Sequence, residues 1–182
     1  ALDPILGADK KDVLAWLTLG ALAMCMGLTS SHLTDQTYAF SNLVVIDSYG
    51  AFWKLLLYIV TGLTVLLSLA YLKAERLSIG EYYGFILLAL AGMMVMVSGA
   101  DLLTIYLGTE LMSLSLYVMA GLKRTEARSL EASAKYFVLG AFSSGVLLYG
   151  ISLLFGVAGS TRLSVIAEAI AAQGPTNPML SL

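Results

Sequence analysis

Long apolar stretches separated by short polar segments dominate the pattern of this chain. A transmembrane helix needs about 20 mostly apolar residues to cross a hydrocarbon core of about 30 Å. Five stretches meet this need, at about residues 13–31, 51–72, 82–99, 102–122 and 132–155. They are apolar on most faces, which is typical of helices that contact lipid and other helices rather than water. The pattern therefore predicts an all-α polytopic membrane protein.

The segments between the apolar stretches add detail to this prediction. The turn at residues 99–101 is so short that the helices on either side should be antiparallel neighbours. Ser129 is placed to cap the last of the five helices, with Glu131 in its first turn. Residues 162–172 read as an amphipathic helix lying at the membrane surface. We expect residues 1–182 to form a single membrane domain.

The loops differ in their content of Lys and Arg, which predicts orientation. Seven such residues lie in the segments on one side of the predicted helices: Lys10, Lys11, Lys73, Arg76, Lys123, Arg124 and Arg128. Arg162 alone lies on the other side, and Lys54 and Lys135 fall inside helices. Since basic loops remain on the cytoplasmic side of a membrane, the N-terminus of this sequence is expected on the cytoplasmic side or its mitochondrial equivalent, the matrix.

The composition excludes several classes of protein. The chain is 59% apolar and 12% charged, and its mean hydropathy is +0.86. These values argue against a disordered protein, a nucleic-acid binder and a water-soluble enzyme. Cys25 is the single cysteine and His32 the single histidine, so neither an internal disulfide nor a zinc cluster is expected.

The two ends of the sequence suggest a longer chain. The first residues do not resemble a signal peptide, because acidic residues stand where a basic segment is needed. Residues 177–182 look like the beginning of another apolar segment. We therefore expect the sequence to be a fragment.

Glu110 is the strongest candidate for chemistry. It lies near the middle of the fourth predicted helix, where a charged side chain costs about 2.5–3.5 kcal/mol on insertion scales. Burial disfavours the charge of a carboxyl group and a nearby cation favours it, so a group balanced between the two can bind and release a proton near neutral pH. The alternative is a structural carboxylate held by hydroxyls such as those of Thr109, Ser113 or Ser115.

Lys135 is the second candidate. It lies in the first turns of the fifth predicted helix, nearer the membrane surface than Glu110, so the two side chains need not touch. It either belongs to a polar path with Glu110, through water or a third residue, or extends to the inner interface as a membrane-anchoring lysine.

The remaining polar and sulfur-containing residues have simpler expectations. Lys54 is interpreted as an interfacial anchor, Asp101 as a turn residue and His32 as an anchor or cap. Cys25 and the methionines are interpreted as packing residues. Gly140 and Ser144, four residues apart, are expected to let two helices approach closely. The sequence has no phosphate-binding loop and no dinucleotide-binding fingerprint.

Two stretches resemble a known family. These are residues 103–114, LTIYLGTELMSL, and residues 129–137, SLEASAKYF, with 25 residues from Glu110 to Lys135. Both are similar to subunit N of proton-pumping NADH–quinone oxidoreductase, respiratory complex I, whose mitochondrial counterpart is NADH dehydrogenase subunit 2. The sibling subunits and the Mrp cation/proton antiporters share the glutamate and a lysine, but they lack the sequence SLEAS that stands at residues 129–133 here. The resemblance is clear over residues 101–159 and looser over residues 11–99.

The resemblance implies a larger fold than this sequence contains. The family has about fourteen transmembrane helices built on two inverted repeats, an arrangement that places ion sites near the midplane. This chain would cover the second to sixth helices and the approach to the seventh. In the family the glutamate at Glu110 pairs with a lysine of the seventh helix, and the lysine at Lys135 is an accessory member of the same polar path.

The resemblance also implies a function and its partners. The chain would be a membrane-arm subunit that translocates protons while quinone is reduced elsewhere in the complex. Other membrane-arm subunits and the lipid bilayer would be its partners, with no nucleic acid. NADH, FMN, iron–sulfur clusters and quinone would bind other subunits, and no cofactor or metal is expected here. A bacterial inner membrane or the mitochondrial inner membrane would be its location. The alternatives are a subunit of a cation/proton antiporter and a purely structural membrane-arm subunit.

Overall fold

The computed structural model describes residues 12–31, 36–74 and 80–173. Their elements follow in the order α1 (Asp12–Ser30), β1 (Thr37–Ala39), β2 (Val44–Ile46), α2 (Ser48–Ala74), α3 (Glu81–Ser98), α4 (Leu102–Ala120), α5 (Ala127–Ala158) and α6 (Leu163–Gln173). The five long helices, α1 to α5, are each long and apolar enough to span a membrane. The described part of the chain thus has the predicted number of spanning helices.

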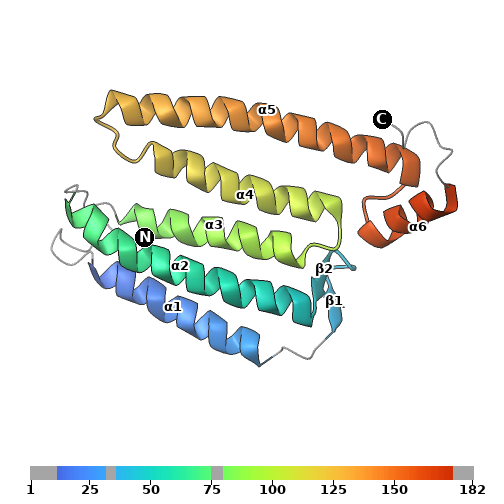
Figure 1. Cartoon of the computed structure of the whole chain (residues 1–182), viewed down its shortest axis with the longest axis horizontal. Helices are drawn as coiled ribbons and strands as arrows, with labels where there is room; N and C mark the ends of the chain where they lie inside the picture. Colours follow the sequence, from blue (N-terminus) through green and yellow to red (C-terminus); the bar gives the residue numbers. More distant parts are fainter. Residues whose placement is uncertain (1–11, 32–35, 75–79, 174–182) are drawn as a thin grey trace.

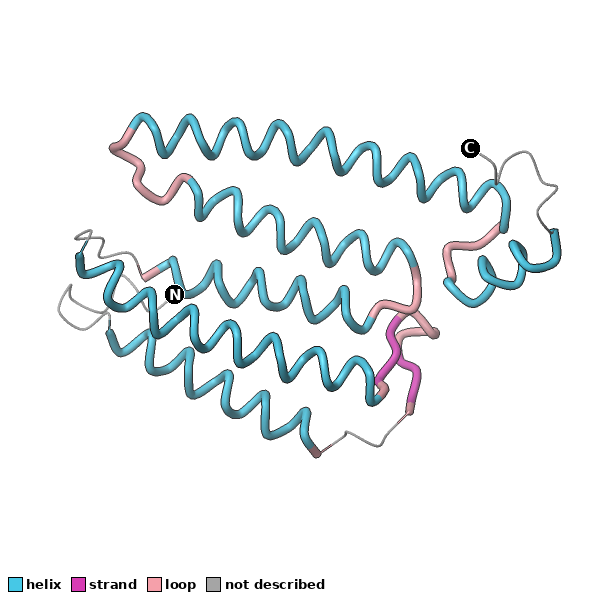
Figure 2. The backbone as a smooth tube through the Cα atoms, viewed as in Figure 1, coloured by secondary structure: helices cyan, strands magenta, loops and turns pink. Residues whose placement is uncertain are grey.

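The long helices lie side by side in sequence order, each roughly antiparallel to the one before it (Figure 1). The hairpin of β1 and β2, the α3–α4 turn and α6 gather at one end of this layer (Figure 2). Short connections explain the order, because a helix that leaves the membrane through a tight turn re-enters beside its predecessor. The apolar core is formed by Ala15, Val65, Leu72, Tyr83 and Ile86, from α1, α2 and α3.

Helices α3 and α4 pack backbone to backbone. A Cβ atom on Gly92 would lie 2.5 Å from the amide nitrogen of Met112 and 2.6 Å from the carbonyl oxygen of Gly108. A Cβ on Gly108 would lie 2.8 Å from the carbonyl oxygen of Gly92. Only glycine fits at either position, which is how small residues allow membrane helices to approach closely. The prediction that these two helices are antiparallel neighbours is confirmed.

The antiparallel hairpin was not predicted. Thr37 pairs with Ile46 and Ala39 with Val44, and its turn holds three consecutive residues at positive φ. The hairpin is attached to the bundle by the amide of Ala100, which donates to the carbonyl oxygen of Leu43 at 2.9 Å. Strands of three residues are too short to show an alternating pattern, so this element could not be recognised from the sequence.

Two helices are longer than predicted. Helix α2 begins at Ser48 because the carboxylate of Asp47 accepts a hydrogen bond from the amide of Gly50 at 2.6 Å and caps it. Helix α5 begins at Ala127 and ends before Gly159, which has the left-handed conformation (φ 67°) that commonly ends a helix. Both helices therefore extend beyond their apolar stretches into polar sequence.

The predicted role of Ser129 is wrong. Glu126 precedes the first turn of α5 and makes no side-chain cap. Ser129 instead donates from Oγ to the carbonyl oxygen of Ala120, at 2.8 Å, and so links α5 to the end of α4. Glu131 follows the first turn of α5 rather than lying in it.

Candidate functional site

Glu110 lies at the middle of α4 and faces α5. Helix α4 runs from Leu102 to Ala120, so Glu110 stands about midway along it, and its side chain is partly buried. Its Oε1 atom accepts a hydrogen bond from the hydroxyl of Ser144 on α5. The candidate carboxylate is thus held across a helix–helix interface by a residue 34 positions away in the sequence.

A tyrosine completes this cluster. The hydroxyl of Tyr106 lies 2.9 Å from Oγ of Ser144. Tyr106 and Glu110 are four residues apart, so they lie on the same face of α4, one turn from each other. This spacing was visible in the sequence, but nothing in the sequence indicated that Ser144 would lie between the two side chains.

Two of the hydroxyls expected to hold Glu110 have other partners. Thr109 donates from Oγ1 to the carbonyl oxygen of Ile105 at 2.9 Å, and Ser115 donates to that of Leu111 at 2.8 Å. Both bonds stay within α4, as is common for Ser and Thr in helices. The expectation that Thr109 or Ser115 holds Glu110 was therefore wrong. The hydroxyl that reaches Glu110 comes from the neighbouring helix.

Lys135 lies near the beginning of α5 and pairs with its own helix. Its Nζ atom is 2.5 Å from Oε1 of Glu131, one turn earlier, and both side chains are mostly exposed. Nine residues separate Lys135 from Ser144, a rise of about 13–14 Å along α5. Within the described residues the two candidate site residues, Glu110 and Lys135, are therefore not brought together.

The approach of α4 and α5 depends on Gly140 and Tyr117. A Cβ atom on Gly140 would lie 1.8 Å from the hydroxyl oxygen of Tyr117. The Tyr117 ring is buried and packs edge-on against Tyr136 and Phe137, at centroid distances of 4.7 and 5.8 Å. The hydroxyl of Ser133 donates to the carbonyl oxygen of Tyr117 at 2.7 Å. The predicted close approach at Gly140 is confirmed.

Asp101 is more than the turn residue that was expected. It is 3% exposed, and its carboxylate caps α4 by accepting from the amide of Leu103 at 2.9 Å. The same carboxylate accepts from the hydroxyl of Thr161 at 2.6 Å. The backbone bonds from Leu102 to Thr161 and from Leu163 to Ala100 run beside it. Asp101 thus fastens the α3–α4 turn to the segment between α5 and α6.

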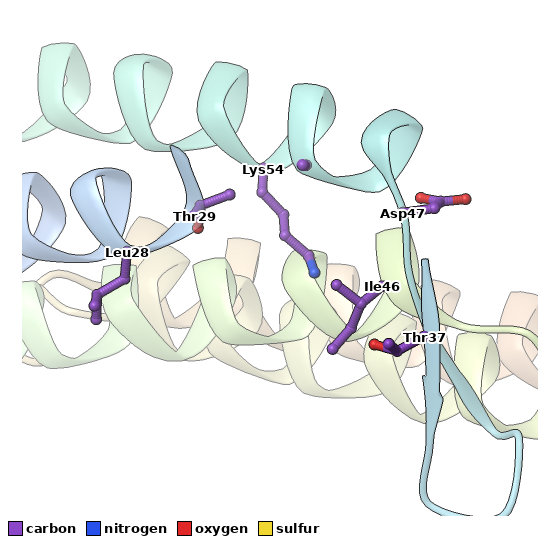
Figure 3. A pocket seen from close by; sticks show the side chains of 7 residues that line it. Leu28, Thr29, Thr37, Ile46, Asp47 and Lys54 are labelled. Atoms are coloured by element: carbon purple, nitrogen blue, oxygen red, sulfur yellow. The ribbon is translucent and has the colours of Figure 1, made fainter. Parts of the chain in front are cut away.

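Lys54 points into a cavity near the beginning of α2 (Figure 3). The cavity has a volume of about 440 Å³, and Lys54 is partly buried in it. Its other lining residues are Leu28, Thr29, Thr37, Ile46, Asp47 and Ala51. The cavity is formed by α1, the hairpin and α2, so Lys54 faces protein on at least one side. Lys54 was expected to be an interfacial anchor, and this contact with protein was not predicted.

The remaining residues that the sequence analysis considered form no second functional site within the described part of the chain. Cys25 and Met24 are exposed on α1, and His32 lies outside the described residues. Among the residues that the structure describes, no group of three or more His, Cys, Asp or Glu side chains could hold a metal ion.

Comparison with known proteins shows what this chain is similar to. Residues 99–182 match the family described as NADH:quinone oxidoreductase/Mrp antiporter, TM. The chain is 43% identical over 174 residues to NADH-quinone oxidoreductase subunit N of Trichlorobacter lovleyi, covering 95% of this chain and 36% of that protein. It is 40% identical over 173 residues to NADH-quinone oxidoreductase subunit N 2 of Rhizobium meliloti, again covering 95% and 36%. The chain thus spans about 36% of the length of these curated relatives.

Solved structures share the fold. A chain of respiratory complex I from Thermus thermophilus, solved with bound aureothin, matches with a TM-score of 0.73 and 28% identity, covering 92% of this chain and 38% of that one. A chain of the membrane-bound sulfane sulfur reductase, an archaeal respiratory membrane complex, also matches with a TM-score of 0.73, at 22% identity, covering 96% and 37%. The second likeness concerns the fold alone.

Proposed function

This chain is a homologue of NADH-quinone oxidoreductase subunit N, an integral membrane protein, and we propose that it translocates protons as an antiporter-like subunit in the membrane arm of respiratory complex I. Its enzymatic role is that of a subunit of the NADH:quinone oxidoreductase. Its partners are the other membrane-arm subunits, including the sibling antiporter-like subunits. NADH, FMN, the iron–sulfur clusters and quinone bind elsewhere in that complex.

The observation that carries this proposal is the placement of Glu110. A carboxylate halfway along an apolar helix is expensive to insert and is most often functional. Here it faces a neighbouring helix and is bonded by a hydroxyl, an environment in which a carboxyl group can exist in both charged and neutral forms. We assign Glu110 as the protonation site of this segment, charged while it pairs with the lysine that the resemblance places on the family's seventh helix, and neutral when that pair is broken.

Lys135 is assigned as an accessory member of the same path. Its charge lies at the end of the bundle that carries Lys73, Lys123 and Arg128, which we place on the cytoplasmic or matrix side. A cation there can attract or repel a proton that moves to or from Glu110 through water. The hairpin and α6 would then face the opposite side of a bacterial or mitochondrial inner membrane.

The test is Glu110→Gln in the assembled complex in sealed membrane vesicles. The amide has nearly the same shape but cannot carry the proton, so we expect proton uptake and NADH–quinone turnover to fall together by at least about tenfold. Glu168→Gln, at an exposed carboxylate of α6, is the matched control and should behave like the wild type. If Glu110→Gln assembles and pumps normally, the carboxylate is structural and the proposal is wrong.

A second candidate function follows from the family description, which includes Mrp antiporters. A subunit of a cation/proton antiporter would exchange sodium for protons without any electron donor. Sodium-dependent proton movement in vesicles that lack NADH, abolished by Glu110→Gln, would favour this function over the redox-driven one.

A further inference from the structure

Tyr106, Ser144 and Glu110 form a continuous chain of hydrogen bonds across the α4–α5 interface. Ser144 donates its single hydroxyl proton to Oε1 of Glu110. A serine hydroxyl has one proton and can accept through its oxygen, so the bond of 2.9 Å between Tyr106 and Ser144 is donated by the tyrosine. Both O–H groups therefore point toward the carboxylate.

We propose that this chain of hydrogen bonds is a relay that carries protons between Glu110 and the end of the bundle where the hairpin and α6 lie. The inference rests on the proposed role of Glu110 as a protonation site. In one transfer, the Ser144 proton moves to the Glu110 carboxylate, the Tyr106 proton moves to Ser144, and a hydronium ion gives a proton to the Tyr106 oxygen and becomes water. One proton enters at Tyr106, one reaches Glu110, and both hydroxyls remain neutral. After this transfer both O–H groups point away from Glu110, so the reverse transfer can follow directly, and reorientation of the two hydroxyls resets the relay for another transfer in the same direction.

The position of Tyr106 shows which end of the bundle the relay connects to Glu110. Tyr106 lies four residues from Leu102, the beginning of α4, a rise of about 6 Å. Beyond this helix end, between the hairpin, the α3–α4 turn and α6, lies a cavity of about 480 Å³. Its polar lining residues include Gln36, Asn42, Asp47, Arg162 and Ser164. A polar cavity of this size has room for several waters, so a source of protons is available at this end.

The charged side chains of the helices packed against α4 lie toward the opposite end. The helices packed against α4 are α3 and α5. Their described charged side chains are Glu81, Arg128, Glu131 and Lys135. Glu81 begins α3, and the other three lie in the first turns of α5. Among the described residues, the hydroxyls of Tyr106 and Ser144 extend by hydrogen bonds from Glu110 toward the hairpin end. The Asp101 carboxylate at that end accepts from Leu103 and Thr161 instead.

The experiment removes each hydroxyl in the assembled complex in sealed vesicles. Ser144→Ala and Tyr106→Phe should each lower proton uptake per complex by about tenfold, because each variant removes one hydroxyl of the path. The double variant should be no slower than the slower single variant, because both residues belong to one path. Ser144→Thr keeps the hydroxyl and should restore proton uptake.

Neighbouring residues supply matched controls. Ser143→Ala removes an exposed hydroxyl that bonds only within α5, to the carbonyl oxygen of Leu139 at 3.0 Å, and Tyr149→Phe changes an exposed tyrosine of the same helix. Both should pump like the wild type. The infrared carboxyl band that disappears in Glu110→Gln should shift in Ser144→Ala and return in Ser144→Thr, which would show that the Ser144 hydroxyl acts on the Glu110 carboxyl group itself.

The outcomes separate this inference from the proposed function. Normal pumping in Tyr106→Phe, or in Ser144→Ala, overturns the relay while a defective Glu110→Gln leaves the proposed function intact. Normal pumping in Glu110→Gln overturns the proposed function itself. If Ser144→Ala does not assemble on a native gel, Tyr106→Phe decides the matter, because it removes one oxygen and keeps the ring.

Discussion

At the scale of single residues, Glu110 and Lys135 show how differently two charges are held on neighbouring helices. Glu110 is partly buried and bonded across an interface by Ser144, whereas Lys135 makes an exposed pair with Glu131 one turn away. Exposed pairs of this spacing contribute about 0.3–0.5 kcal/mol, because water screens the charges and both long side chains lose freedom. The Glu131–Lys135 pair therefore does little for stability.

A prediction separates the ion pair from a role in proton movement. Glu131→Gln removes the pair and should change the free energy of unfolding by about 0.5 kcal/mol or less, with normal proton uptake. Lys135→Ala should lower proton uptake severalfold, and Lys135→Arg, which keeps the charge, should restore it. Proton uptake in vesicles and thermal denaturation of the complex are the measurements. Equal defects in Glu131→Gln and Lys135→Ala would mean that the pair itself matters and that Lys135 is not an accessory of the path.

At the scale of helices, the α4–α5 interface sets the geometry of the candidate site. Gly140 allows the ring of Tyr117 to lie directly against α5, and two serines of α5, Ser129 and Ser133, donate to carbonyl oxygens near the end of α4. These contacts fix the rotation of α5 about its axis, and that rotation places Ser144 against Glu110.

Gly140→Ala tests this account. The added methyl group would meet the hydroxyl and ring of Tyr117, and Tyr117 has little room to move because it is buried against Tyr136 and Phe137. Overpacking of this kind costs about 1–3 kcal/mol. The loss should appear as a lower temperature of complex dissociation on native gels.

Gly145→Ala is the matched control for this substitution. Nothing lies within 4 Å of a Cβ atom on Gly145, and alanine is the better helix former, so stability should stay the same or rise. Equal losses in the two variants would show that the Tyr117 contact is not what makes Gly140 necessary.

At the scale of the whole molecule, the two ends of the helix layer differ in charge and in structure. The hairpin, the α3–α4 turn and α6 lie at one end, and the α4–α5 connection and the end of α2 lie at the other (Figure 1). Arg162 precedes α6 at the first end, whereas the second end carries Lys73, Lys123, Arg124 and Arg128. Basic loops resist translocation across a membrane. The asymmetry therefore predicts that the hairpin faces the outside of a bacterial cell.

Labelling of single cysteines checks this orientation. In a Cys25→Ser background, Ser41→Cys places an exposed thiol in the hairpin and Thr125→Cys places one in the α4–α5 turn. A membrane-impermeant maleimide added to intact cells should label the hairpin thiol, and should label the turn thiol only after the cells are permeabilised. The opposite labelling would reverse the orientation, and with it the side of the membrane that the proposed relay connects to Glu110.

The sequence by itself determined the number and order of the helices, because the length of an apolar stretch and the thickness of a bilayer are enough to define a spanning segment. It also made Glu110 the candidate for proton chemistry, since the cost of inserting a carboxylate is a property of its position along one helix. The antiparallel neighbours α3 and α4 followed from the three residues between them. These are local quantities, or quantities set by the membrane.

Only the tertiary structure decided which side chains meet. Ser144 was interpreted as a packing residue and Ser129 as a cap, yet each donates a hydrogen bond to α4. The hairpin depends on a backbone bond from Ala100 to Leu43. Whether a side chain reaches the next helix depends on the rotation of both helices about their axes. That rotation is set by contacts between residues far apart in the sequence, such as Gly140 with Tyr117. The pattern of apolar residues along the chain does not predict it.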